Sequence, residues 1–93
     1  GQDEGSPSSS QPSEMSDEAL DATLSSRQKK VFLLIAEMGE IGPSVVTKEL
    51  DISLSTAYRD LVTLEELNLV VSLDGGKRKL TKRGIDFLGY IFR

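Results

Sequence analysis

The spacing of apolar residues changes at Asn68, and this change restricts the folds open to the chain. Before Asn68, three segments carry apolar residues at the three- and four-residue intervals typical of amphipathic helices. After it comes a short apolar run, Leu69 to Leu73, and then Asp-Gly-Gly-Lys at residues 74–77, whose glycines suit a tight hairpin turn. The sequence therefore predicts an α+β, mostly α, domain in which helices precede a β-hairpin and a last helix.

Serine and threonine residues stand just before the helical segments, where N-caps are expected. Such side chains accept a hydrogen bond from a backbone N–H in the first turn. Gly39 is the expected end of the first of these helices. A short extended connector is expected at residues 40–43, because Pro43 biases the residue before it away from helix. The expected caps are Ser25 (in a capping-box spacing with Gln28), Ser44, Ser53 and Thr81, for helices ending near residues 38, 50, 68 and 92.

The N-terminal region differs in composition from the rest of the chain. Residues 1–14, GQDEGSPSSSQPSE, contain no aliphatic side chain to bury, so we expect a flexible linker there. Residues 15–24 fit a short helix over 16–23, capped by Ser16, and an ordered extension equally well. We expect an acidic tail over residues 1–23 and one folded domain over residues 24–93.

The formal net charge of −4 is unevenly distributed. Residues 1–24 hold six acidic residues and no Lys or Arg, so residues 25–93 carry eleven basic residues against nine acids, a net of +2. Five positive charges fall within seven residues, from Lys77 to Arg83. A concentrated basic patch attracts a polyanion whatever the total charge, so the folded part is suited to a nucleic-acid partner.

Several classes of site are missing from the sequence. The chain has no cysteine and no histidine, which excludes disulfides, zinc-finger ligand sets and histidine acid–base chemistry. Glu65 and Glu66 are adjacent on a helix and do not face each other, and Asp-Gly-Gly-Lys is a turn rather than a phosphate-binding loop. We expect no enzyme, no metal and no cofactor. No apolar run approaches the roughly 20 residues that cross a bilayer, so we also expect no membrane insertion.

Three stretches carry a family resemblance. They are LSSRQKKVFLLIAEMG, VVTKELDISLSTAYRDLVTLEELNLV and GGKRKLTKRGIDFL. In this order they resemble the first helix, the helix-turn-helix core and the wing of MarR, ArsR and related archaeal regulators. The resemblance covers residues 24–93 and implies a winged helix-turn-helix fold, with a three-helix core, a β-hairpin wing and a C-terminal helix.

The same resemblance implies a function. It points to sequence-specific binding of double-stranded DNA by a cytoplasmic transcription regulator, or by the C-terminal DNA-binding module of a larger regulator. A winged-helix fold also serves in protein–protein interaction modules of larger assemblies, which is the alternative from a different class. The modest positive charge of the folded part and the surplus of apolar residues in the last helix support this alternative.

The front of the expected helix at residues 54–68 is short and polar. In a helix-turn-helix, the N-terminal residues of the second helix face base edges and phosphates, and short side chains let the backbone approach. Arg59 can pair with guanine or with a phosphate. Ser53 is the expected cap in any case, one or two of the others can be merely solvated, and Asp60 must point away from a polyanion. The candidate DNA-binding residues are Ser53, Ser55, Thr56, Tyr58 and Arg59.

The basic patch follows the hairpin turn. Lys77, Arg78 and Lys79 are the candidate wing contacts to phosphate or the minor groove, and the competing interpretation is protection of an exposed strand edge. Strand alternation sends Lys77 and Lys79 to one face and Arg78 to the other. The further candidate phosphate contacts are Ser44, Lys48, Lys82 and Arg83.

The last expected helix is apolar on more than one face, which is typical of a helix buried on several sides. We expect Ile85 and Leu88 to face the core. The other apolar face needs a partner, which is either the segment Leu20–Leu24 or a second copy of the chain. The resembled families imply a homodimer, and the candidate interface residues are Leu20, Phe87, Tyr90 and Ile91.

Overall fold

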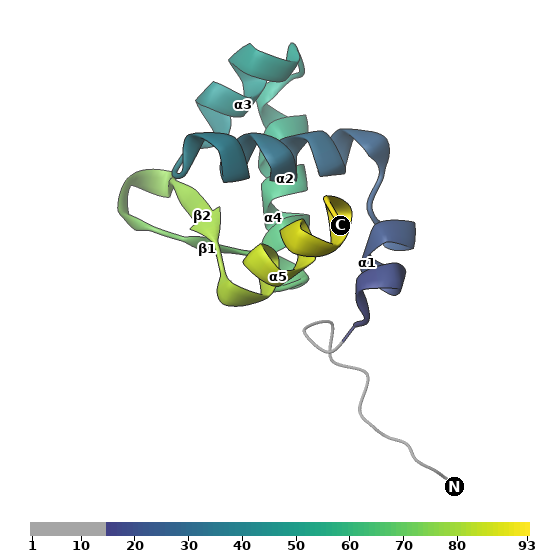
Figure 1. The fold of residues 1–93 in the computed structure, drawn as a ribbon. Helices are drawn as coiled ribbons and strands as arrows, with labels where there is room; N and C mark the ends of the chain where they lie inside the picture. The colour runs from purple at the N-terminus through teal and green to yellow at the C-terminus, as the bar shows by residue number, and fades with distance from the viewer. Residues whose placement is uncertain (1–14) are drawn as a thin grey trace, which may run out of the picture.

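The computed structural model describes residues 15–93, so the linker expected over residues 1–14 lies outside the described part (Figure 1). The predicted class, a mostly helical α+β winged helix, is confirmed. The elements are α1 (Asp17–Thr23), α2 (Ser26–Met38), α3 (Pro43–Leu50), α4 (Leu54–Glu66), β1 (Val70–Ser72), the 3-10 turn η2 (Asp74–Gly76), β2 (Arg78–Leu80) and α5 (Lys82–Ile91).

Three of the four predicted caps are confirmed. Each accepts a hydrogen bond from the backbone N–H three residues ahead, and in α2 the Gln28 side chain accepts the reciprocal bond from the Ser25 N–H at 3.0 Å. Ser16 caps α1 in the same way, so residues 17–23 form a helix rather than an extension. The confirmed caps are Ser25, Ser53 and Thr81.

The predicted cap of α3 is wrong. Ser44 lies inside the helix, Gly42 is the N-cap, and Pro43 takes the first helical position. Proline suits that position because its φ is already helical and its missing N–H would have had no partner there. At the other end of α3, Asp51 adopts a left-handed conformation (φ 55°, ψ 50°), and this residue turns the chain into α4.

The hairpin wing is short. β1 and β2 pair antiparallel, with Val70 opposite Leu80 and Ser72 opposite Arg78. Gly75 and Gly76 have φ of 80° and 81°, which confirms the predicted glycine turn. On the outer edge of β2, Ile41 exchanges both backbone hydrogen bonds with Arg78, at 2.8 and 3.1 Å. The connector before α3 is thus tied to the wing.

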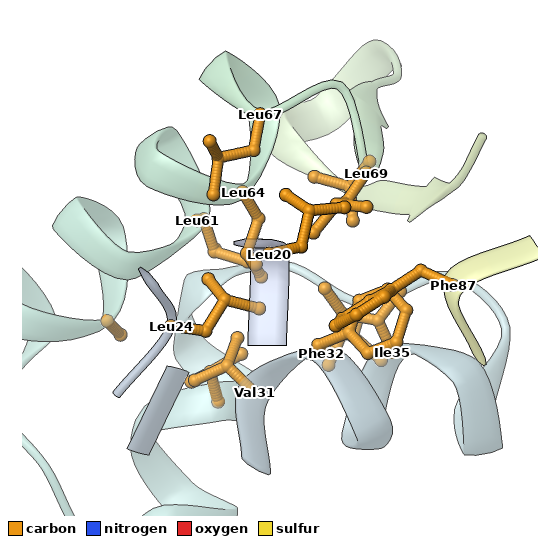
Figure 2. Close-up of a cluster of buried hydrophobic side chains, with 14 residues drawn as sticks. Leu20, Leu24, Val31, Phe32, Ile35, Leu61, Leu64, Leu67, Leu69 and Phe87 are labelled. Atoms are coloured by element: carbon orange, nitrogen blue, oxygen red, sulfur yellow. The ribbon is translucent and has the colours of Figure 1, made fainter. Parts of the chain in front are cut away.

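The core is built from buried side chains of all five helices and of β1 (Figure 2). Within it, Phe32 of α2 and Phe87 of α5 are in contact, with ring centroids 5.4 Å apart. Figure 2 shows Leu20 of α1 pointing into the same cluster, and Leu20 and Leu24 are both buried. The packed part of the chain therefore extends to the N-terminal side of the domain boundary that we expected at residue 24.

The expected orientation of α5 is wrong at Ile85, which is 58% exposed, whereas Leu88 packs against the core as expected. Of the two partners expected for the other apolar face, the structure confirms the segment Leu20–Leu24. α1 lies beside α5 (Figure 1), and Leu20 and Phe87 are buried in the same cluster. Leu20 and Phe87 are therefore core residues and are not available to a dimer interface. Tyr90 stacks on Phe87 with centroids 6.1 Å apart.

Candidate nucleic-acid interface

The front of α4 presents an outward stripe of polar side chains. Ser55, Tyr58 and Arg59 are exposed and recur at helical intervals. Ser53 is occupied locally, because its Oγ accepts from the Thr56 N–H at 3.1 Å and donates to Thr56 Oγ1 at 2.9 Å. Ser53 and Thr56 thus form the helix cap, and the surface that α4 offers is the stripe Ser55–Tyr58–Arg59.

Asp60 points away from that stripe. Its side chain is 2% exposed and accepts two hydrogen bonds from Arg27 of α2, Nε to Oδ2 at 2.6 Å and Nη2 to Oδ1 at 2.9 Å. The hydrogen bond and the charge of Asp60 raise the pKa of Arg27. The Asp60 carboxylate is thus paired with Arg27 and does not face the outward stripe. The DNA-binding hypothesis requires this, because an exposed carboxylate there would repel phosphate.

Arg27 is a residue that sequence reasoning missed. It lies 33 residues from Asp60, and no local pattern joins the two. With Asp60 and Arg59 it borders a polar hollow of about 290 Å³ between the start of α2 and the front of α4. Gln28, Thr56 and Thr63 complete the lining. The N-terminal end of α2, which carries Arg27, therefore lies next to the outward stripe of α4.

The wing presents two of its three predicted contacts. Lys77 and Lys79 are exposed, whereas Arg78 is only 5% exposed. Alternation along β2 turns Arg78 toward the protein, where Nη1 donates to the Gly76 carbonyl at 2.5 Å and Nη2 to Glu65 of α4 at 3.3 Å. The assignment of Arg78 as a surface phosphate contact is therefore wrong, because its guanidinium is buried and pairs with Glu65.

The remaining phosphate candidates divide in the same way. Ser44 and Lys48 are exposed on α3, and Lys82 is exposed at the start of α5, with its Nζ 3.8 Å from Asp86. Arg83 does not fit the prediction, because it pairs with Asp17 at 2.7 Å and donates to the Met15 carbonyl at 2.8 Å. Its role in the structure is to hold α1 against α5.

Two links connect the wing to α4. Glu65 accepts from Arg78 of β2 and also from the Ser72 hydroxyl of β1. The guanidinium of Arg78 lies 5.4 Å from the centroid of the Tyr58 ring, so the outward stripe of α4 adjoins the base of the wing at Tyr58. In the part of the chain that the structure describes, no three acidic side chains gather into a metal site, and no helix is long and apolar enough to span a membrane.

Comparison with known proteins gives matches only among solved structures, since no protein-family model and no curated protein matches the chain. MarR from E. coli in its reduced form is 27% identical, with a TM-score of 0.70 over 80% of this chain. The multiple antibiotic-resistance repressor (MarR) from Listeria monocytogenes is 31% identical, with a TM-score of 0.66 over 74% of this chain. The PhiH1 repressor-like protein from Haloarcula marismortui is 26% identical, with a TM-score of 0.61 over 73% of this chain and 80% of its own.

This chain spans 56% and 50% of the two MarR proteins, which is about half of their length. The resemblance that the sequence carries is confirmed by these structures. The order of helices, the tight turn between α3 and α4, and the hairpin after α4 agree with it. The chain is a winged helix-turn-helix domain with the fold of the MarR proteins.

Proposed function

We propose that the chain binds double-stranded DNA sequence-specifically, as a transcription regulator or as the DNA-binding module of a larger one. The observation that carries the proposal is the division of charge on α4. Arg59, Tyr58 and Ser55 face outward, while the Asp60 carboxylate is buried against Arg27. The front of α4 thus exposes an arginine and buries its acid, while the exposed Glu66 lies at the far end of the helix, and such a front is suited to a polyanionic surface.

In the proposed complex, the front of α4 enters the major groove. The small Ser55 side chain lets the helix end come close to the duplex, and Arg59 donates to a guanine edge or a phosphate. Lys77 and Lys79 on the wing, Ser44 and Lys48 on α3, and Lys82 on α5 contact the DNA backbone. Since residues 25–93 carry a net charge of only +2, we expect base contacts to supply a large share of the affinity.

The test is a binding titration. A duplex selected from a randomised pool is labelled, and its Kd is measured by fluorescence anisotropy at several salt concentrations. Each phosphate contact contributes about −0.9 to the slope of log K against log salt, so the four lysines named above predict a slope of roughly −3.6 for each bound chain. Arg59→Ala should weaken binding by about 1–3 kcal/mol.

A matched control separates a specific contact from general charge. Arg93→Ala removes a charge of the same sign from the C-terminal end, where the guanidinium carbon of Arg93 lies 3.9 Å from the centroid of the Tyr90 ring. This variant should leave the Kd within about twofold of wild type. A folded protein that binds no duplex even at low salt contradicts DNA binding. That result would favour the protein-interaction alternative.

A homodimer is the second part of the proposal. An apolar groove of about 350 Å³ runs between α2 and α5, lined by Leu33, Ala36, Glu37, Leu88 and Phe92. Phe92 is 70% exposed there, a large apolar area to leave in water. We place the second copy on this groove; of the candidate interface residues, only the half-buried Tyr90 and Ile91 remain.

Sedimentation velocity tests the homodimer. Wild type should sediment as a dimer at micromolar concentration, and Phe92→Ser should sediment as a monomer. Ala22→Ser, on the exposed side of α1, is the control and should stay dimeric. A dimer would also require two half-sites about one turn of DNA apart in the selected duplex. A monomeric wild type, or a Phe92→Ser variant that remains dimeric, contradicts this placement.

A further inference from the structure

Arg78 is the charged side chain of the wing that does not face solvent. Only 5% of it is exposed, and burial of a guanidinium costs free energy unless its charge and donors are matched. Nη1 and Nη2 have partners, in Gly76 and Glu65, while Nε is buried without a hydrogen-bond partner among residues 15–93. An incompletely matched buried charge stabilises a fold poorly, so its position calls for another explanation.

The contacts of Arg78 come from three separate parts of the domain. Its backbone pairs with Ile41 in the connector before α3. Its side chain reaches the turn of the wing through the Gly76 carbonyl and reaches α4 through Glu65. Glu65 and Tyr58 are seven residues apart, about two helical turns, so Arg78 lies along one face of α4 between them.

The two contacts on α4 have different effects. The Glu65 contact fixes how far the wing stands from the helix, and Ser72 of β1 holds the same carboxylate from the other strand. The Tyr58 contact places the guanidinium 5.4 Å from the centroid of a ring that is 53% exposed. A cation at this distance restricts the orientation of the ring. One buried side chain thus holds both the wing and a residue of the outward stripe.

We propose that Arg78 is a positioning residue for DNA binding: it sets the wing at one distance from α4, so that both can engage the same duplex. This inference rests on the proposed function. Arg78 makes no contact with DNA in this arrangement. Two contact surfaces that are already fixed relative to each other bind with a smaller loss of conformational entropy than two that move independently.

Lysine cannot replace Arg78 in this role. The guanidinium directs its donors along fixed directions in one plane, toward Gly76 and Glu65, whereas an ammonium is a single point charge on a flexible chain. We therefore expect Arg78→Lys to keep the charge of the wing and lose the geometry. Arg78→Met keeps a long side chain at the position but loses both the positive charge and the hydrogen-bond donors.

The test compares these variants with a true surface lysine. Arg78→Met and Arg78→Lys should each weaken binding to the selected duplex about tenfold, with the slope of log K against log salt unchanged, because no phosphate contact is lost. Lys79→Ala should instead reduce the magnitude of the slope by about 0.9. Glu65→Met removes both acceptor oxygens and so breaks the same link from the side of α4. It should give the same result as Arg78→Met, which keeps the test decisive if an Arg78 variant does not fold.

Hydrogen exchange in the free protein gives a readout that does not depend on DNA. The N–H groups of Leu73 and Arg78, which donate to the carbonyls of Lys77 and Ile41, should exchange at least fivefold faster in Glu65→Met, while amides inside α2 keep their wild-type rates. Unchanged exchange of the wing amides overturns the inference. An unchanged Kd for Arg78→Met also overturns it. So does a salt slope for Arg78→Met that is smaller in magnitude by about 0.9, because that is the effect of losing one phosphate contact. A wild-type protein that binds no duplex contradicts the proposed function instead. The exchange rates then still show whether the contact between Arg78 and Glu65 holds the wing against α4.

Discussion

Two glycines of α5 should respond in opposite ways to the same substitution. A Cβ added at Gly84 would lie 2.1 Å from the Leu69 carbonyl oxygen, whereas ordinary contacts begin at 3.4 Å. A Cβ added at Gly89, five residues later in the same helix, would meet no atom within 4 Å. We therefore expect Gly84→Ala to destabilise the domain and Gly89→Ala to stabilise it.

The size of the first effect follows from how firmly Leu69 is held. Its carbonyl accepts from the Thr81 N–H at 3.0 Å, its N–H donates to the Leu64 carbonyl at 3.0 Å, and its side chain is fully buried. Overpacking of this kind costs about 1–3 kcal/mol, and weakening the bond to Thr81 costs about 1 kcal/mol more. The better helix propensity of alanine returns up to about 1 kcal/mol, so a net loss of about 1–4 kcal/mol is expected, with a central value of about 2.5 kcal/mol.

Urea denaturation followed by circular dichroism at 222 nm measures both variants. Gly84→Ala should also lower Tm by roughly 10–20 °C, since 1 kcal/mol corresponds to about 4–8 °C in a domain of this size. Gly89→Ala should raise the free energy of unfolding by up to about 1 kcal/mol. If Gly84→Ala is as stable as wild type, or if both variants shift in the same direction, the close packing of α5 against the Leu69 backbone is refuted.

Two further pairs of variants test the cap of α4 and the packing of α1. Ser53→Ala should lower the free energy of unfolding by about 1 kcal/mol through loss of the cap, and Ser55→Ala should leave it unchanged; equal stability of the two in chemical denaturation would contradict the assignment of Ser53. Leu20→Ala should cost about 2–4 kcal/mol, because its side chain is fully buried, whereas deletion of residues 1–14 should leave Tm unchanged. A thermal melt of Leu20→Ala that matches wild type would show that α1 does not stabilise the domain.

The sequence predicted those features that depend on neighbouring residues. The caps Ser25, Ser53 and Thr81 each bond a residue three positions ahead, so the signal and its partner lie in the same short stretch. The glycine turn of the wing is local in the same sense, because positive φ at Gly75 and Gly76 follows from residue type. Ser44 was assigned incorrectly because two local signals competed, and the proline at the first helical position decided where α3 begins.

The features that the sequence did not predict depend on distant partners. Arg83 looked like one more charge of the basic patch, but its partner Asp17 lies 66 residues earlier, on a helix that the sequence left undecided. The position of Phe87 depends on a distant partner in the same way, because the sequence left open whether the segment Leu20–Leu24 or a second copy of the chain covers it. Arg78 belonged to a basic run, and only its pairing with Glu65 across the fold shows that it is buried.

The division of labour on α4 has a consequence for how such a domain can change its target. Folding relies on the inward side chains Ala57, Leu61 and Leu64, which are fully buried, whereas Ser55 and Arg59 lie on the surface. Surface substitutions away from structural contacts usually change stability by less than about 0.5 kcal/mol. A library randomised at these two surface positions should therefore consist mostly of folded proteins. New operator preferences can then be selected, in the laboratory or in evolution, without first acquiring compensating mutations in the core.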